Sequence, residues 1–322
     1  MDDILPRLSR AKIFTVVDVK NGYWHVQLDA PSSNLTTFGA PNGRYRWTRL
    51  PFGLSVAADI FQRKLDDVLT GLSNVARIVD DVIIWGDGDN LEDARRSHDL
   101  HVGVFFTQMR RGNVRLNAAK LEDRCRVVKF AGYILSSEGH RADPEKIRVI
   151  DEMTQPQNVT ELRRFCGMVN YLAKYVQHLS SLMEPIHQLT RKDTAWEWTP
   201  EHERAFAQVK KALITSPTLA FFSNEKATTL QCDASQYGLG AVVLEDGKPV
   251  AYASRALTST EQNYAQIEKD LLAVLFGFEK FDVYTFGRLV NVESDHKPLQ
   301  AIVKKPMVLV EAHHGNKRTI SI

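Results

Sequence analysis

The sequence is poor in the features that mark secreted, membrane-spanning or strongly basic proteins. It has only three cysteines among 322 residues, Cys125, Cys166 and Cys232. Such widely separated cysteines fit reduced thiols, and they exclude a disulfide framework or a cysteine-based zinc site. We find no signal peptide and no apolar run long enough to cross a bilayer. The 41 Lys and Arg residues nearly balance the 39 Asp and Glu residues, so the formal charge of +2 does not by itself indicate a nucleic-acid binder.

The length and the local grouping of basic residues say more than the totals. A chain of 322 residues predicts two or three domains with sizeable cores. Basic residues recur in short groups, including 44–49, 63–64, 110–115 and 163–164. Each group is more often a solvated face than a track for phosphates.

The stretch RIVDDVIIWG, residues 77–86, places two adjacent aspartates between apolar runs rich in β-branched residues. This pattern predicts two buried strands joined by a turn that carries Asp80 and Asp81. Two carboxylates on one tight turn repel each other, and apolar surroundings increase that repulsion. A divalent cation binds hard oxygen ligands and cancels the repulsion, which favours a metal site. The competing interpretation, and the commoner one for an isolated Asp-Asp pair, is a solvated turn.

A third aspartate ends another apolar run. The segment IFTVVD, residues 13–18, predicts a strand that ends at Asp18, and the Asn-Gly pair at 21–22 is a turn signal. Residues 23–28 alternate as in a half-buried strand. One aspartate at a strand end and two on a hairpin turn can converge on two metal ions. Such a pair stabilises both the attacking and the leaving oxygen of a phosphoryl transfer.

These motifs, taken in order, resemble a known family. FTVVD at 14–18 with Gly-Tyr at 22–23, LPFGL at 50–54 and IVDD at 78–81 are similar to the reverse transcriptase of Ty3/gypsy-type long-terminal-repeat retrotransposons. DASQYGLG at 233–240 and SDHKPL at 294–299 resemble the ribonuclease H domain that follows in the same polyprotein. The resemblance covers nearly all of residues 5–306, and several motifs in one fixed order make it specific.

The resemblance implies roles for the first set of residues. Asp18, Asp80 and Asp81 would hold two Mg²⁺ ions, with Mn²⁺ as a substitute, while a primer 3′-OH attacks the α-phosphorus of a dNTP. Tyr23 would be the steric gate whose ring fills the space of a ribose 2′-OH, although the residues alone favour a core tyrosine. A loop that carries Phe52 and Gly53 is expected to lie against the nucleotide and the template.

The resemblance implies a second carboxylate set, consisting of Asp233, Asp270 and Asp295. It would hold two ions that activate water against the RNA of an RNA–DNA hybrid. Asp270 stands on a long helix where the family normally has glutamate. An aspartate is one methylene shorter, so its oxygens fall short of the metals by roughly an ångström, a misplacement that costs about 10²-fold in rate. Glu268 points to another side of the helix and is expected to be solvated.

A second departure from the family lies beside the Asp-Asp pair. Ile78 stands where reverse transcriptases usually have tyrosine, and we expect altered nucleotide or primer contacts without loss of the chemistry. Ser55 is a candidate cap for the following helix, and His98 and His101 are expected to be surface residues of a later one rather than metal ligands. Residues 238–240 predict a turn in a sheet and no dinucleotide loop.

The hydrophobic periodicity and the turn signals predict the remaining elements. Hairpins are expected at 35–48 and 127–139, helices at 90–109, 144–153, 160–178, 181–190, 200–214, 260–281 and 297–303, and strands at 230–233, 239–244, 250–254 and 289–295. The last six of these, from residue 230 onward, follow the ribonuclease H order of three strands, a helix, a strand and a helix.

Together these features predict a multidomain chain of α+β and α/β class, with the palm and thumb of a right-hand polymerase followed by a ribonuclease H-like domain. The expected domains are a palm with truncated fingers at 1–140, thumb and connection helices at 141–222, a C-terminally incomplete ribonuclease H-like domain at 223–306 and a divergent tail at 307–322.

The expected function is that of an RNA-directed DNA polymerase of a retrotransposon with an attached ribonuclease H. Its expected partners are an RNA template, a DNA primer, an RNA–DNA hybrid and dNTPs, with protease and integrase elsewhere in a polyprotein and no membrane. We expect it inside the cell, in a cytoplasmic particle or the nucleus. One alternative is a degenerate or co-opted fragment that binds nucleic acid without catalysis, and another is a metal-dependent nuclease alone.

Overall fold

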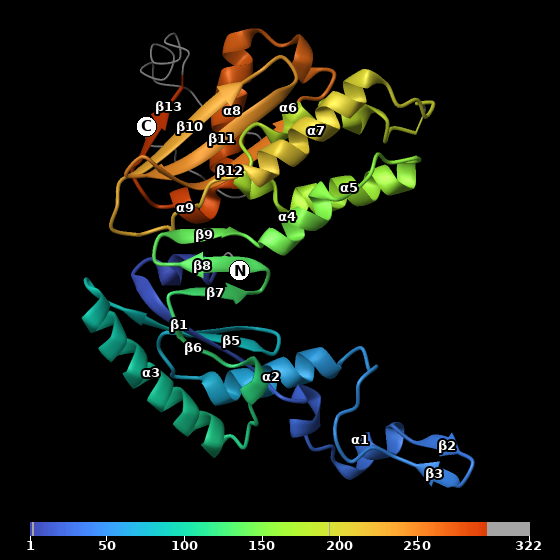
Figure 1. Cartoon of the computed structure of the whole chain (residues 1–322), viewed down its shortest axis with the longest axis vertical. Coiled ribbons are helices and arrows are strands. Elements are labelled where there is room, and N and C mark those ends of the chain that lie inside the picture. Colours follow the sequence, from blue (N-terminus) through green and yellow to red (C-terminus); the bar gives the residue numbers. More distant parts are fainter. Residues whose placement is uncertain (2, 193, 295–322) are drawn as a thin grey trace, which may run out of the picture. The chain divides into compact units, whose positions relative to one another are not determined.

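The computed structural model describes residues 1, 3–192 and 194–294, which form two compact units that divide between Ser137 and Glu138 (Figure 1). The expected limit between palm and thumb, at 140/141, lies close to this division. The expected limit at 222/223 falls inside the second unit and stays a prediction. The predicted strand end and helix at 295–303, and the tail, lie outside the described residues.

The first unit is built on a four-stranded antiparallel sheet in the order β4-β5-β1-β6. Its strands are β1 (Ala11–Asp18), β4 (Val75–Ile78), β5 (Asp81–Asp87) and β6 (Glu122–Cys125). The apolar runs of the sequence supply the two central strands, β1 and β5, whose side chains are almost all buried. The predicted strand pair around the Asp-Asp turn is therefore confirmed.

Two helices, α2 (Ala57–Leu69) and α3 (Leu91–Arg111), complete the core of this unit. Phe61 and Leu65 of α2 and Phe105 of α3 pack with Val82 of β5 in one buried cluster. Helix α3 lies so close to the sheet that a Cβ on Gly86 would stand 2.1 Å from the carbonyl oxygen of Ala94. A strand glycine is therefore needed at this contact.

The rest of the first unit consists of short elements around this sheet. They are η1 (Leu5–Leu8), η2 (Gly22–His25), α1 (Ala30–Leu35), β2 (Phe38–Ala40), β3 (Gly43–Tyr45), η3 (Ala118–Lys120), β7 (Val127–Phe130) and β8 (Tyr133–Ser136). The predicted hairpin at 35–48 is confirmed as the pair β2–β3, with shorter strands than expected. The hairpin predicted at 127–139 was expected to turn at 136–139, whereas the pair β7–β8 turns at 131–132, within the expected strand.

Three expectations for the first unit are wrong. Residues 22–25 form the 3₁₀ turn η2 and not a strand, because Asn21 takes a left-handed backbone (φ 55°) that turns the chain. Ser55 does not cap α2, whose first turn follows Val56 with no side-chain cap. His98 is buried instead of exposed, and its Nε2 lies 2.8 Å from the hydroxyl of Thr15 in β1. A polar partner on the sheet makes that burial possible.

The second unit contains a helical part and a sheet. The unit begins with the strand β9 (Gly139–Ala142). The helical part follows and comprises α4 (Pro144–Asp151), α5 (Val159–Tyr171), η4 (Ala173–Tyr175), α6 (Leu179–Gln188) and α7 (Pro200–Ile214). These positions confirm the predicted helices, the last of them with the expected bounds. Pro200 fits at the start of α7 because the first helical N–H has no partner to lose.

The sheet of the second unit has the order β12-β11-β10-β13 and is antiparallel except for the parallel pair β10–β13. Its strands are β10 (Thr228–Ala234), β11 (Gly238–Glu245), β12 (Lys248–Ala256) and β13 (Val290–Glu293). Between β12 and β13 the chain forms η5 (Glu261–Asn263), α8 (Gln266–Lys280) and α9 (Asp282–Thr285). Helix α8 packs on β10 and β11. The predicted order of strands and helix is confirmed as far as the described residues reach.

The expected turn at 238–240 is wrong, because both glycines belong to β11. A Cβ on Gly238 would stand 2.8 Å from the hydroxyl of Ser180, and one on Gly240 would stand 2.8 Å from the ring of His178. These glycines let the start of α6 approach the sheet rather than reverse the chain.

Candidate active site

The sheet register of the first unit brings two of the predicted carboxylates opposite each other. Asp18 is the last residue of β1 and Asp81 the first of β5, and they are direct partners across the antiparallel pair. Directly opposed residues in such a pair have Cα atoms about 4.5–5.5 Å apart. Asp80 stands one residue earlier, in the two-residue loop of the β4–β5 hairpin. Asp18 and Asp81, which are 63 positions apart in sequence, therefore meet because two apolar strands pair.

The loop that carries Asp80 is strained. Val79, the other loop residue, has a φ of 56° and is partly exposed. A β-branched residue rarely takes this left-handed conformation, which a hairpin loop normally assigns to glycine, asparagine or aspartate. Such strain costs of order 1–3 kcal/mol and is commonest at functional sites.

The three aspartates affect one another electrostatically. Burial raises the pKa of Asp81 above its usual 3.8, and the nearby carboxylates Asp80 and Asp18 raise it further. Asp18 is itself buried, with 8% of its surface exposed. A like-charged, partly desolvated set of carboxylates favours a proton or a cation at this place.

Two residues that our sequence reasoning missed complete this site. The Lys120 ammonium lies 2.8 Å from Oδ2 of Asp18, and the side-chain amide of Asn117 donates to Oδ1 of the same residue over 3.3 Å. The hydrogen bond to Asp18 and the charges of Asp18, Asp81 and Asp80 raise the pKa of Lys120. No local pattern could reveal a pair that joins residues 102 positions apart.

The donor set fits divalent cations. Ionised carboxylates are the hard oxygen ligands that Mg²⁺ prefers, and the Lys120 ammonium already stands where a cation relieves the repulsion among them. The side chains are not gathered as tightly as a metal site requires, since no cluster of three or more His, Cys, Asp or Glu side chains suited to a metal occurs among residues 1, 3–192 and 194–294.

An aromatic cluster beside this site unites the predicted nucleotide-binding residues. The ring of Tyr23 lies 4.9 Å from that of Phe52 and 5.6 Å from that of Phe61, measured between centroids. Gly22 has no room for a side chain, because a Cβ would stand 2.7 Å from the Phe61 ring. Gly53 has a φ of 90°, a conformation that favours glycine. Tyr23, which follows Asp18 by five residues, is therefore held in place by packing against two aromatic rings.

The second predicted carboxylate set is placed differently. Asp233 lies near the end of β10, is half-exposed, and has its Oδ2 4.0 Å from Nδ1 of His178. Asp270 lies in the first turns of α8 and is buried, with 2% of its surface exposed. Gln266 links Asp270 to the end of β10. Its side-chain amide donates to Oδ1 of Asp270 and to the carbonyl of Ala234, the residue after Asp233, each over 2.9 Å.

Both of these carboxylates therefore lie at the same end of β10. Asp295 lies outside the described residues. Glu268 is exposed, as expected, and accepts a hydrogen bond from the backbone N–H of Ala265 over 2.9 Å, which caps α8. That role explains an acidic residue in the first turn of the helix without any part in catalysis.

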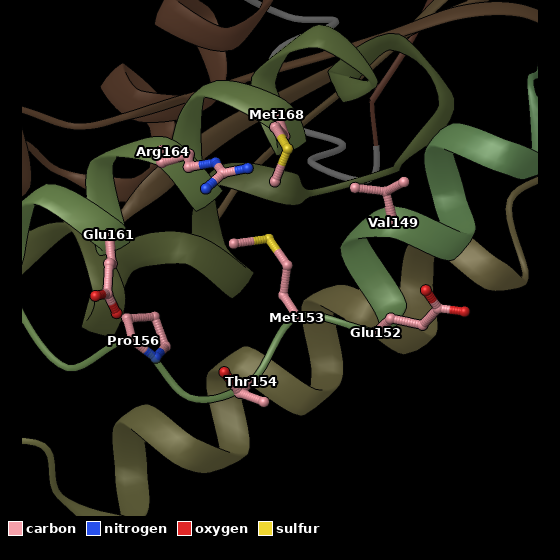
Figure 2. A pocket seen from close by; sticks show the side chains of 8 residues that line it. All are labelled: Val149, Glu152, Met153, Thr154, Pro156, Glu161, Arg164 and Met168. Atoms are coloured by element: carbon pink, nitrogen blue, oxygen red, sulfur yellow. The ribbon is translucent and has the colours of Figure 1, made fainter.

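A separate cavity of about 390 Å³ lies in the second unit, between the end of α4 and α5 (Figure 2). Figure 2 shows Met153 and Met168 directed into the same space, with Val149 and Arg164 beside them. None of the predicted site residues lines it, so it is not a candidate for the chemistry.

Comparisons with known proteins support both halves of the chain. A family model described as reverse transcriptase (RNA-dependent DNA polymerase) matches residues 2–135. A second, described as an RNase H-like domain found in reverse transcriptase, matches residues 198–292.

Curated relatives and a solved structure agree with these matches. The chain is 34% identical over 313 residues to the retrovirus-related Pol polyprotein from transposon opus of Drosophila melanogaster, covering 92% of this chain and 31% of that protein. It is 32% identical to the Pol polyprotein from transposon gypsy of the same species, covering 92% and 30%. The chain thus spans about a third of the length of these relatives.

The fold is shared with a solved structure of the foamy viral protease–reverse transcriptase in complex with double-stranded DNA. The TM-score is 0.84 at 24% identity, covering 95% of this chain and 54% of that one. The opposed aspartates, the aromatic cluster and these similarities all lead to one conclusion. The chain belongs to the reverse transcriptase family and joins a reverse transcriptase domain to an RNase H-like domain, as in the Pol polyproteins of gypsy-type retrotransposons.

Proposed function

We propose that this chain carries the polymerase centre of an RNA-directed DNA polymerase, which extends a DNA primer on an RNA template with dNTPs. The observation that carries the proposal is the register of β1 against β5, which sets Asp18 directly opposite Asp81, with Asp80 beside it. The relatives' Pol polyproteins support it at the level of family.

Asp18, Asp81 and Asp80 would hold divalent cations, Mg²⁺ or Mn²⁺. When bound, such ions neutralise charge on the triphosphate and favour ionisation of the primer hydroxyl. Asn117 donates a hydrogen bond to the Asp18 carboxylate and orients it, and Lys120 provides positive charge beside it. The strained loop at Val79 keeps Asp80 and Asp81 at the turn of the β4–β5 hairpin.

Tyr23 would select deoxynucleotides. Its ring is held by Phe52 and Phe61, five residues after Asp18, and it would occupy the space of a ribose 2′-OH. A Tyr23→Ala variant should lose discrimination against ribonucleotides while still extending primers with dNTPs.

The test is Mg²⁺-dependent primer extension on an RNA template with the purified chain. We expect extension that is lost in the Asp80→Asn/Asp81→Asn double variant and kept in Asp67→Asn, which removes an exposed aspartate from α2. Binding of primer–template without extension by the unaltered chain would overturn the proposal and favour the alternative, a nucleic-acid-binding fragment without catalysis.

We also propose that the second unit cleaves RNA in an RNA–DNA hybrid. Asp233 and Asp270 at one end of β10, with Asp295 as the third carboxylate, would hold the cations. The match of residues 198–292 to RNase H-like domains supports this second activity. Hybrid cleavage that persists in Asp233→Asn would contradict it.

Protease and integrase would be other parts of the same polyprotein, since the relatives are Pol polyproteins about three times as long as the match. We further propose an intracellular setting, in a cytoplasmic particle or the nucleus. The three free cysteines, two of them buried, support it.

A further inference from the structure

The Arg77 side chain joins the hairpin that carries Asp80 and Asp81 to helix α2. Its Nε donates to Oδ1 of Asp66 over 2.7 Å, and its Nη2 pairs with the other oxygen of the same carboxylate. Nη2 also donates to the backbone carbonyl of Gln62 over 3.3 Å. The guanidinium thus makes two parallel bonds to one carboxylate and a third bond to the helix backbone, which fixes its position more closely than a single bond would.

This ion pair differs from the others of the first unit in its burial. The side chain of Arg77 is 14% exposed. The side chains of Arg10, Arg95 and Arg124, which also form ion pairs, are exposed by 57%, 57% and 64%. Exposed ion pairs hold their partners weakly, whereas a pair with two parallel bonds and little solvent around its arginine can hold a strand in place.

Arg77 holds the hairpin from the face of the sheet opposite the carboxylates. It is the register partner of Val82, whose side chain is buried with α2 and α3 in the core of the unit. Side chains alternate between the two faces of a strand, so Asp81, one residue before Val82, lies on the other face. Asp18, the register partner of Asp81, shares that face. The ion pair therefore leaves the face of the carboxylates unobstructed.

The hairpin needs support from outside. Strand β4 has four residues and stands at the edge of the described sheet, where its one neighbouring strand is β5. The loop after β4 contains Val79, whose left-handed backbone (φ 56°) persists only where the surrounding structure holds it. Arg77 precedes Val79 by two residues, so its bonds act where the chain enters the strained loop.

We propose that the ion pair of Arg77 and Asp66 is a clamp that positions Asp80 and Asp81 to hold their cations. Arg77 lies on the face away from the carboxylates and Asp66 belongs to α2, so both are positioning residues that act through the loop. The inference rests on the proposed function, because the aspartates that the clamp positions are those of the polymerase centre.

The first test is Mg²⁺ binding by the full chain, measured as the Mg²⁺ concentration that half-saturates the shift in Tm. Arg77→Gln and Asp66→Ala should each raise this concentration by about tenfold, as loss of a residue that orients metal ligands does. The double variant should raise it no further, because the two residues act as one unit. Arg63→Gln and Asp67→Asn, which remove exposed charges from α2, are the matched controls and should leave it unchanged.

The sign of the effect in Arg77→Gln separates positioning from simple electrostatics. Loss of a positive charge from the hairpin would by itself favour a bound cation, so charge alone predicts tighter Mg²⁺ binding. Arg77→Lys keeps the charge but not the two parallel bonds, and it should still weaken Mg²⁺ binding. In primer extension this variant should lower kcat by about tenfold with little change in KM for primer–template, because misplaced ligands affect the chemistry and not the duplex.

Amide hydrogen exchange tests the clamp without any activity. Exchange in residues 75–84 should be faster in Arg77→Gln than in the unaltered chain, and exchange in β1 and α3 should not change. If Arg77→Gln does not fold, Arg77→Lys provides the same comparison.

Two results would overturn the inference. They are Mg²⁺ binding that is unchanged or tighter in Arg77→Gln and Arg77→Lys, and hairpin exchange that is no faster in either variant. An unaltered chain that binds Mg²⁺ but extends no primer would contradict the proposed function alone, and the clamp would still be judged by these two results. An unaltered chain with no Mg²⁺-dependent shift in Tm would overturn both.

Discussion

The two carboxylate sites of this chain are held together by different structural contacts. In the first unit, Asp18 and Asp81 stand on adjacent strands, and the hydrogen-bonded register sets their separation. In the second unit, Asp233 stands on β10 and Asp270 on α8, so their separation depends on how a helix packs against a sheet. That packing uses Gly277, where a Cβ would stand 3.0 Å from the sulfur of Cys232. The strand-borne pair is therefore defined more directly by the chain's own backbone.

The two sites also differ in countercharge. Asp18 has the ammonium of Lys120 at 2.8 Å. Asp233 has the ring of His178 at 4.0 Å, which is charged only when protonated, and Asp270 has the neutral amide of Gln266. The first site thus carries a lysine ammonium of its own, whereas the His178 partner of Asp233 carries a charge only when it is protonated. The following variants test whether this difference matters.

The largest effect should come from removing a charge of the strand-borne pair. Asp18→Asn should lower the rate of primer extension by more than about 100-fold, because loss of a direct ligand exceeds the effect of removing its outer partners. Hybrid cleavage by the second unit should not change. Equal loss of both activities in this variant would show that the sites are not separate.

Lengthening the helix-borne carboxylate should give the next largest effect. Asp270→Glu should raise hybrid cleavage by up to about 10²-fold, because the extra methylene extends the carboxylate toward the end of β10. Primer extension serves as the internal control. An unchanged or lower rate of cleavage would show that the buried Asp270 is a structural partner of Gln266.

The resident cation of the first site should compete with metal. Lys120→Gln should tighten apparent Mg²⁺ binding by about two- to fivefold, the worth of an exposed ion pair. The measurement is the Mg²⁺ concentration that half-saturates the shift in Tm. Arg124→Gln, which removes an exposed arginine paired with Asp99, is the control and should leave this concentration unaltered.

The smallest effects concern pH and stability in metal-free buffer. Because the folded-state pKa of Asp81 is raised, ionisation of this carboxyl destabilises the folded chain as pH rises above 3.8. Asp81→Asn should therefore increase Tm at neutral pH by roughly 1–2 °C. The gain should disappear below pH 3.8, and a gain that is independent of pH would contradict this origin.

Glu261 in the second unit should behave in the opposite way. Its hydrogen bonds with Arg255 lower its pKa to about 2 from 4.5, so its stabilising effect is complete above 4.5 and is lost as pH falls toward 2. Glu261→Gln should destabilise the chain at neutral pH and have no effect near pH 2. Thermal unfolding of both variants across this range completes the comparison.

The sequence by itself determined the class of fold and the candidate carboxylates. Apolar runs that end on Asp18 and surround Asp80 and Asp81 predict buried strands, because burial of β-branched residues is a local property of the pattern. Ordinary periodicity likewise predicted α7 and the order of strands in the second unit. The motifs were informative because each is one short, continuous stretch of the chain.

Only the tertiary structure decided which side chains meet. It set Asp18 opposite Asp81, placed Lys120 on Asp18, buried His98 against Thr15 and assigned Gly238 and Gly240 to a strand. It also gathered Lys20, Arg49 and Arg115 around one pocket of the first unit, from positions up to 95 residues apart. These outcomes depend on strand register and on contacts between distant segments, which hydrophobic periodicity does not encode.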